Sequence, residues 1–89
     1  MTQGKGQHDI ERKLAEIFRR VFDDAKLEWS RELSSVDLPR WDARHNEQLL
    51  LEVQREFRVR FRAAEAAQLK NAGDLADAVH ARLSGEPWP

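Results

Sequence analysis

The sequence predicts an all-α protein, a single bundle of four helices with a long first loop and a short third helix. Apolar residues recur at intervals of three and four along most of the chain, which is the period of a helix with one buried face. The one stretch that alternates apolar and basic residues is five residues long and has no partner strand elsewhere. We expect one domain at residues 9–84, a flexible segment at 1–8 and a tail at 85–89.

The composition excludes several classes of protein. A net charge of −1, with 35% charged residues, gives no overall field that would attract nucleic acid or an anionic membrane. The chain has no Cys, and its three His are far apart, so we expect no disulfide and no metal site. It has neither an apolar run of about 20 residues nor a signal-peptide core. With no nucleophile–base arrangement in the sequence, we expect a cytoplasmic protein that is not an enzyme.

The first helix is predicted from an apolar stripe that begins directly after Asp9, which is a suitable N-cap residue. Charged side chains occupy the opposite face, so we expect about four turns with one buried side. The stripe consists of Ile10, Leu14, Ile17, Phe18, Val21, Phe22 and Ala25.

Residues 26–40 break the helical period and predict a long loop. Pro39 disfavours a helical conformation at the preceding residue, and Ser34 and Ser35 are expected to serve as loop and capping hydroxyls. The loop is nevertheless too apolar for a free linker, so we expect it to pack on the bundle. The apolar side chains available for this are Leu27, Trp29, Leu33, Val36 and Leu38.

The second helix is predicted to begin after an Asp42 N-cap and to cover residues 43–57. Leu51 falls off its apolar stripe and is expected to be half exposed, and His45 is expected at the surface, where it could help to hold an anion at the helix N-terminus. The buried stripe consists of Leu49, Leu50, Val53 and Phe57.

The rest of the chain predicts two further helices. The alternating stretch Phe57–Phe61 is interpreted as an extended connector. An alanine-rich segment from Ala63 to about Lys70 favours a short helix that Asn71 and Gly73 end. Asp74 is predicted to cap the last helix, which Ser84 and Gly85 stop. Its stripe consists of Leu75, Ala78, Val79, Arg82 and Leu83.

The joint spacing of these residues resembles the acyl carrier protein family, the phosphopantetheine-binding carrier domains, over nearly the whole domain. Trp41-Asp42 precedes the position that reads Ser in the family pattern Trp-Asp-Ser-Leu, and Phe57 and Phe61 bracket a run similar to Phe-Gly-Val-x-Phe. Glu65 occupies the acidic position that opens the third helix. The remaining matches are Leu49, Leu50, Val53, Leu69, Gly73-Asp74-Leu75 and Val79.

The resemblance also implies that the attachment residue is missing. In the family, a Ser hydroxyl forms the phosphodiester to 4′-phosphopantetheine, whereas this chain has Ala43, flanked by Asp42 and Arg44. A methyl group has no oxygen to phosphorylate, so we expect no cofactor. The phosphopantetheine arm is expected only if the native gene encodes Ser in place of Ala43.

The surroundings of Ala43 depart from the family as well. Arg44 replaces a Leu, and Glu47 stands where the family usually has an apolar residue. The recognition helix of the family is typically acidic, whereas residues 40–62 carry six Arg and four acidic residues, a local balance of +2. Two interpretations remain open: a natural carrier homologue that has lost the modification, or a working carrier whose Ser was replaced.

The function that this resemblance implies is a non-catalytic docking or scaffold role with a carrier-dependent biosynthetic enzyme, in a monomeric protein. We expect the second helix to supply the partner-binding surface. Its predicted residues are Trp41, Arg44, His45, Glu47, Gln48 and Leu51. One alternative is a genuine acyl or peptidyl carrier that shuttles thioesters. Another is a small helical module that binds nucleic acid through its Arg residues.

Overall fold

A computed structural model describes residues 7–84 of the chain, and within that range it contains four helices and no strand. The helices are α1 (Gln7–Val21), α2 (Ala43–Phe57), α3 (Ala63–Ala67) and α4 (Ala72–Ser84). The all-α prediction is therefore confirmed. The tail at 85–89 and most of the segment expected to be flexible lie outside the described residues. Between residues 7 and 84, no helix is long and apolar enough to cross a membrane.

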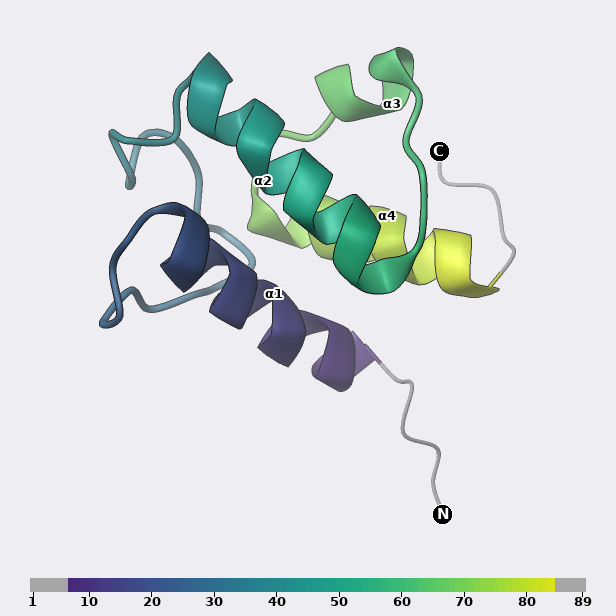
Figure 1. Cartoon of the computed structure of the whole chain (residues 1–89), viewed down its shortest axis with the longest axis horizontal. Helices are drawn as coiled ribbons and strands as arrows, with labels where there is room; N and C mark the ends of the chain where they lie inside the picture. Colours follow the sequence, from purple (N-terminus) through teal and green to yellow (C-terminus); the bar gives the residue numbers. More distant parts are fainter. Residues whose placement is uncertain (1–6, 85–89) are drawn as a thin grey trace.

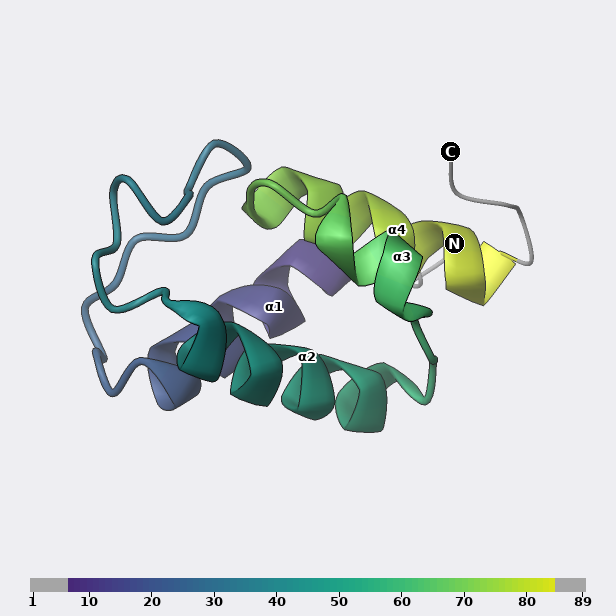
Figure 2. The same ribbon diagram turned by 90° about the horizontal axis from the view of Figure 1, so that it is seen from above.

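The helix α1 is the centre of the arrangement, because it packs against both α2 and α4 (Figures 1 and 2). The short α3 lies beside α2 and α4 at the edge of the bundle. The long loop between α1 and α2 gathers at one end of the molecule. The start of α1 and the last turn of α4 lie at the other end, so the two ends of the bundle have different structures.

The core is apolar throughout, with no buried polar or charged side chain among the described residues. Phe18 is fully buried and lies at the centre of an aromatic cluster. Its ring packs edge-on against Trp29 at 6.3 Å and against Trp41 at 5.3 Å, so the aromatic contacts tie the long loop to α1. The largest fully buried side chains are Phe18, Phe22, Leu14, Ile17, Leu49, Leu75, Val53 and Val79.

The boundaries of α1 correct the prediction at both ends. The helix begins at Gln7, so Asp9 lies in its first turn and does not cap the helix. Its Oδ1 forms an ion pair with the guanidinium of Arg12, with 3.0 Å between the oxygen and the nitrogen. The helix ends at Val21 because the chain turns at Asp23, whose φ of 52° is left-handed. Ala25 is consequently exposed and not part of the buried stripe.

The long loop packs on the bundle as predicted, with one exception. Leu27 is buried, and Trp29, Leu33 and Leu38 are partly buried against the core. Val36 is 87% exposed, because it sits in a local turn in which its backbone N–H donates to Ser34 Oγ at 3.3 Å. A tight turn can be closed only by neighbouring groups, and here it directs the valine outward.

The bounds of α2 agree with the prediction at both ends. Its N-cap is Asp42, and Leu49 and Val53 are buried while Leu51 is 56% exposed. The C-cap is Arg58, which adopts the left-handed conformation with φ 57°. Residues 58–62 form an extended connector without a strand, as expected.

The end of α3 and the start of α4 differ from the prediction. The helix α3 covers only five residues, and α4 begins at Ala72 rather than after Asp74. Asn71 caps α4 because its Oδ1 accepts the backbone N–H of Asp74 at 2.8 Å, while the Asp74 carboxylate accepts the N–H of Lys70 at 2.9 Å. Gly73 is therefore a buried residue inside α4 and not a helix stop. Leu83, expected on the apolar stripe, is 47% exposed.

The start of α4 is joined directly to the long loop. The N–H groups of Ala72 and Gly73 donate to the carbonyl oxygens of Leu33 and Arg31, each at 2.8 Å. These are amide groups of a first helical turn, which have no partner inside their own helix. The loop thus completes α4, and an added Cβ at Gly73 would come within 3.0 Å of both Arg31 Cβ and Arg31 O.

Candidate functional site

The residues that precede α2 form a rigid entry to the helix. The Trp41 indole Nε1 donates to Asn46 Oδ1 at 2.9 Å, and the Trp41 backbone N–H donates to Leu38 O at 2.8 Å. Its ring also contacts Phe22 at 6.1 Å, in addition to Phe18. Trp41 is therefore a half-buried packing residue that fixes where α2 begins.

Asp42 caps α2 through contacts with a single residue. Its Oδ1 accepts the backbone N–H of His45 at 2.9 Å and lies 2.9 Å from the His45 ring Nδ1. The bond from the backbone N–H, followed by the contact with the ring, lowers the pKa of Asp42 below its ordinary value of 3.8. The carboxylate is therefore ionised at neutral pH and complements the free amide groups of the helix start.

The structure places His45 against the core, in contrast to the prediction of a solvated surface residue. Its ring stacks on Phe22 with 5.6 Å between the ring centres and 23° between the planes. A histidine in the first helical turn can fold back onto the end of a neighbouring helix when an aromatic ring is accessible there. The sequence carried no signal for this contact, because Phe22 lies 23 residues earlier.

Ala43 is the first residue of α2 and lies at the edge of a pocket of about 250 Å³. The pocket lies between the start of α2 and the segment that joins α3 to α4. It is lined by Ser35, Trp41, Asp42, Ala43, Asn46, Leu69 and Lys70. Ala43 itself is exposed, so the helix start and the pocket are both accessible from solvent.

The outward face of α2 carries four of the six residues predicted to bind a partner. Arg44, Glu47, Gln48 and Leu51 are all exposed and follow the spacing of one helix face. The other two, Trp41 and His45, are turned inward, as described above. The structure therefore brings the four outward residues together and separates them from the two aromatic ones.

The acidic residues of the second half of α2 do not belong to this outward face. Glu52 forms an ion pair with Arg20 of α1 at 3.1 Å, and Glu56 forms one with Lys13 of α1 at 3.2 Å. Both pairs lie across the α1–α2 junction. The local charge counted along the sequence therefore understates how basic the outward surface is.

A second hollow, of about 440 Å³, lies at the far end of the same face. Of its lining residues, the sequence-based prediction of the site included only Leu51. The signal was the alternation of apolar and basic residues in the connector, which places basic side chains next to apolar ones. The lining residues are Leu51, Gln54, Arg55, Val59, Arg60 and Phe61.

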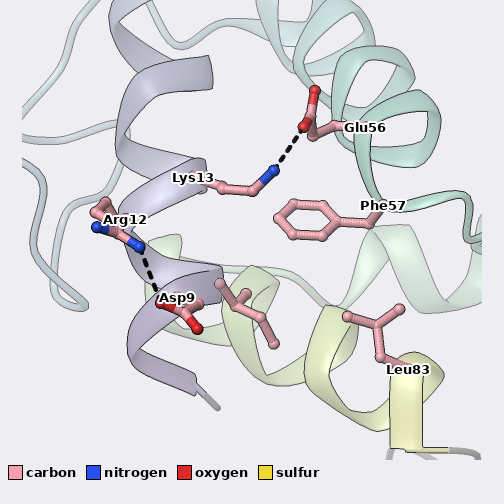
Figure 3. A pocket seen from close by; sticks show the side chains of 7 residues that line it. Asp9, Arg12, Lys13, Glu56, Phe57 and Leu83 are labelled. Atoms are coloured by element: carbon pink, nitrogen blue, oxygen red, sulfur yellow. Dashed lines mark hydrogen bonds and ion pairs between the residues drawn. The ribbon is translucent and has the colours of Figure 1, made fainter. Parts of the chain in front are cut away.

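A third hollow, of about 510 Å³, lies at the end of the bundle where α1 begins and α4 ends. Figure 3 shows the ring of Phe57 pointing into it toward α1, with Leu83 below that ring. Its polar rim consists of two ion pairs, Asp9 with Arg12 and Lys13 with Glu56. Because these charges neutralise one another, the rim selects no ligand of a particular charge.

No cluster of His, Asp and Glu that could hold a metal ion occurs in the part of the chain that the structure describes. Of the three His, His45 stacks on Phe22 and its ring Nδ1 lies 2.9 Å from Asp42 Oδ1.

The bundle of four helices, with α1 packed against α2 and α4 and a capped start of α2, is an acyl-carrier-type fold, as the comparison with a solved structure establishes. The fold matches the solution NMR structure of holo acyl carrier protein from Geobacter metallireducens with a TM-score of 0.80. The two chains are 36% identical, and the match covers 85% of this chain and 87% of that chain. This chain therefore belongs to the acyl carrier protein family. No protein-family model matches it, and no curated protein does so at a significant level.

The residue at the start of α2 does not fit a covalent phosphopantetheine arm. The phosphodiester needs a side-chain oxygen, and Ala43 ends in a methyl group. Ser35 supplies the one hydroxyl among the residues that line the adjacent pocket, but it lies on the long loop and not at the helix start.

Proposed function

We propose that this protein is a carrier-like docking or scaffold partner of carrier-dependent biosynthetic enzymes that acts without a phosphopantetheine arm. One observation at the start of α2 carries the proposal. Asp42 caps the helix, but the first helical residue, Ala43, has no hydroxyl group to which an arm could be attached. A carrier surface without a nucleophile retains the ability to be recognised and loses the ability to carry an acyl group.

The intact frame around Ala43 supports a binding role for this end of α2. Asp42 makes two contacts with His45, and the Trp41 indole donates a hydrogen bond to Asn46. These contacts fix the direction of the helix and so the positions of Arg44 and Glu47 on its outer face. A surface that is rigid before binding loses less conformational entropy on docking.

The exposed Arg44 indicates that the partners of this chain differ from the enzymes that bind carriers with an acidic second helix. Among residues 7–84 it makes no ion pair, and it lies one residue after Ala43 at the point where a docking enzyme would meet the helix. Charge complementarity governs the rate of encounter and excludes partners of like charge. The proposed partners are therefore enzymes of carrier-dependent synthesis whose contact surface accepts a basic residue here.

The first experiment measures intact mass after incubation with coenzyme A and a broad-specificity phosphopantetheinyl transferase. We expect the chain with Ala43 to gain no phosphopantetheine, because Ala43 cannot accept it. Modification of this chain at any residue would overturn the proposal of an unmodified docking protein. The Ala43→Ser variant is the matched sample: its modification would mean that the surface is still read by the transferase and that Ala43 alone prevents loading.

The second experiment tests docking itself, by in vivo cross-linking and mass spectrometry of the tagged chain. We expect cross-links from α2 to a carrier-dependent enzyme, and we expect Arg44→Glu to remove them while the far-UV circular dichroism stays unchanged. Arg12→Glu on α1 is the matched charge reversal and should keep the cross-links, since its exposed pair with Asp9 contributes little stability. Equal cross-linking by Arg44→Glu and the native chain would contradict the proposal.

The genuine carrier remains the second candidate, and one observation favours it. The pocket of about 250 Å³ beside Ala43 opens at the residue from which an arm would extend. If the native gene encodes Ser at this position, the Ala43→Ser protein is the working form, and its function is thioester transport in fatty-acid, polyketide or peptide synthesis. Sequencing the native gene decides between the two.

A further inference from the structure

We propose that the second half of α2 and the connector after it bind an acidic protein segment that inserts one apolar side chain into the hollow beside Leu51. The inference rests on the proposed docking function and names the chemistry of the partner. It moves the centre of the surface from the start of α2 toward its end.

The shape of the hollow is fixed by hydrogen bonds, because Gln54 holds the connector against the end of α2. The side-chain Oε1 of Gln54 accepts the backbone N–H of Phe61 at 2.9 Å, and its carbonyl oxygen accepts the N–H of Val59 at 3.1 Å. The left-handed conformation of Arg58 turns the chain so that both bonds form. The walls of the hollow are thus fixed by hydrogen bonds between α2 and the connector.

The hollow has an apolar side that nothing in the described chain covers. Leu51 is 56% exposed and stands at its edge, while Phe61 is half-buried and Val59 forms part of its wall. A large exposed aliphatic side chain next to a concave surface is a site at which a partner gains by burying an apolar anchor. The occupant therefore presents an aliphatic or aromatic side chain.

The rim of the hollow is basic and unneutralised. Arg55 and Arg60 line it, and Arg58 is exposed between them in the sequence. Within residues 7–84 none of the three forms an ion pair, and the two acids in the second half of the same helix, Glu52 and Glu56, are paired with Arg20 and Lys13 of α1. A partner that brings carboxylates to this rim gains electrostatic attraction, whereas a basic partner is repelled.

An acidic protein segment accounts for both features together. Nucleic acid would satisfy the Arg residues but would leave Leu51 and the apolar wall without a matching group, unless a base stacked there. A neutral apolar peptide would satisfy the wall and leave the Arg residues unused. An amphipathic segment with carboxylates on both sides of a Leu or Phe matches the whole rim.

The test is an NMR titration of the ¹⁵N-labelled protein with two synthetic helical peptides of equal length. One carries Leu on one face and Glu elsewhere, and the other has Lys at every Glu position. We expect the Glu peptide to shift the amide signals of residues 51–61 and the Lys peptide to leave them unchanged. The Arg55→Glu/Arg60→Glu variant should weaken binding of the Glu peptide by about tenfold or more, equivalent to about 1.4 kcal/mol.

The controls separate charge from folding and from other partners. Arg55→Gln/Arg60→Gln removes the charge without reversing it and should give an intermediate loss, and Arg12→Glu should bind like the native protein. Equal binding of both peptides, shifts confined to other residues, or tighter binding of a single-stranded oligonucleotide at residues 51–61 would overturn the inference.

The outcome is also distinguishable from failure of the proposed function. Binding of the Glu peptide at residues 51–61, without cross-links to any carrier-dependent enzyme, would support this surface and contradict the docking proposal. Cross-links that depend on Arg44 but survive Arg55→Glu/Arg60→Glu would support docking and overturn the inference about the hollow.

Discussion

The carboxylate of Asp42 contacts His45 twice, at the backbone N–H and at ring Nδ1, each at 2.9 Å. The first contact is a helix cap, and the second holds the imidazole in the position from which it stacks on Phe22. One acidic side chain therefore links the start of α2 to the end of α1.

Removing the cap should destabilise the protein. Asp42→Ala leaves the N–H of His45 without a partner and frees the imidazole, so we expect a melting temperature lower by several degrees. Asp42→Asn retains a side-chain oxygen of the same reach and should recover most of the loss. Thermal unfolding followed by circular dichroism measures both, and equal melting temperatures for the Asp42→Ala variant and the native protein would contradict the role assigned to the cap.

The same contacts predict a loss of stability in acid. Because the pKa of Asp42 in the folded protein lies below its ordinary value of 3.8, its contribution is present above that pH and is lost as the pH falls through the folded pKa. The pKa of Glu65 is lowered too, first by the Arg62 backbone N–H and then by Arg82, from its ordinary 4.5. Urea unfolding between neutral pH and about pH 3 should show this fall, and Asp42→Asn should make it shallower.

Arg58→Gly should stabilise the protein. Arg58 has a φ of 57°, a conformation that costs a residue with a Cβ about 1 kcal/mol and costs glycine little. We expect a gain in the free energy of unfolding of up to about 1 kcal/mol, reduced by the greater freedom of glycine in the unfolded chain. Arg58→Ala keeps the strain and should not show the gain. Equal stabilities of the Gly and Ala variants in urea would contradict the interpretation.

Gly73→Ala should destabilise the protein, although alanine usually favours a helix over glycine. The new Cβ would lie 3.0 Å from Arg31 Cβ and 3.0 Å from Arg31 O. Neither atom is at the mobile end of the Arg31 side chain, so the backbone of the loop would have to shift to make room. We expect a loss of about 1 kcal/mol, with weaker bonds from the start of α4 to the loop. An unchanged or higher melting temperature would mean that the loop moves aside easily.

Two leucines of α2 offer a matched test of the buried and exposed faces. Leu49 is fully buried, so Leu49→Ala should cost about 3 kcal/mol of unfolding free energy. Leu51 is 56% exposed, so Leu51→Ala should change stability by less than about 0.5 kcal/mol. If Leu51→Ala is as destabilising as Leu49→Ala, Leu51 is a core residue and cannot be the exposed apolar side chain at the edge of the proposed surface. Urea unfolding of the two variants provides the comparison.

The sequence determined the features that depend on neighbouring residues. The bounds of α2 were predicted correctly because Asp42, three residues before His45, caps it locally and because its apolar stripe has a regular period. The connector and the exposed Leu51 followed from the same local pattern. The resemblance to acyl carrier proteins also lay in the spacing of residues, and the structural match is consistent with it.

The tertiary structure decided the features that depend on residues far apart in the chain. The start of α4 was predicted three residues too late, because Gly73 is accommodated inside the helix by the Arg31 carbonyl, 42 residues earlier. Glu52 and Glu56 were counted in the local charge of residues 40–62, but α1 takes both as ion-pair partners, so they do not neutralise Arg55 and Arg60 at the end of α2. A helix cap and a stripe need only short-range order, whereas the partner of a charge or of a free amide is fixed only when separate segments pack together.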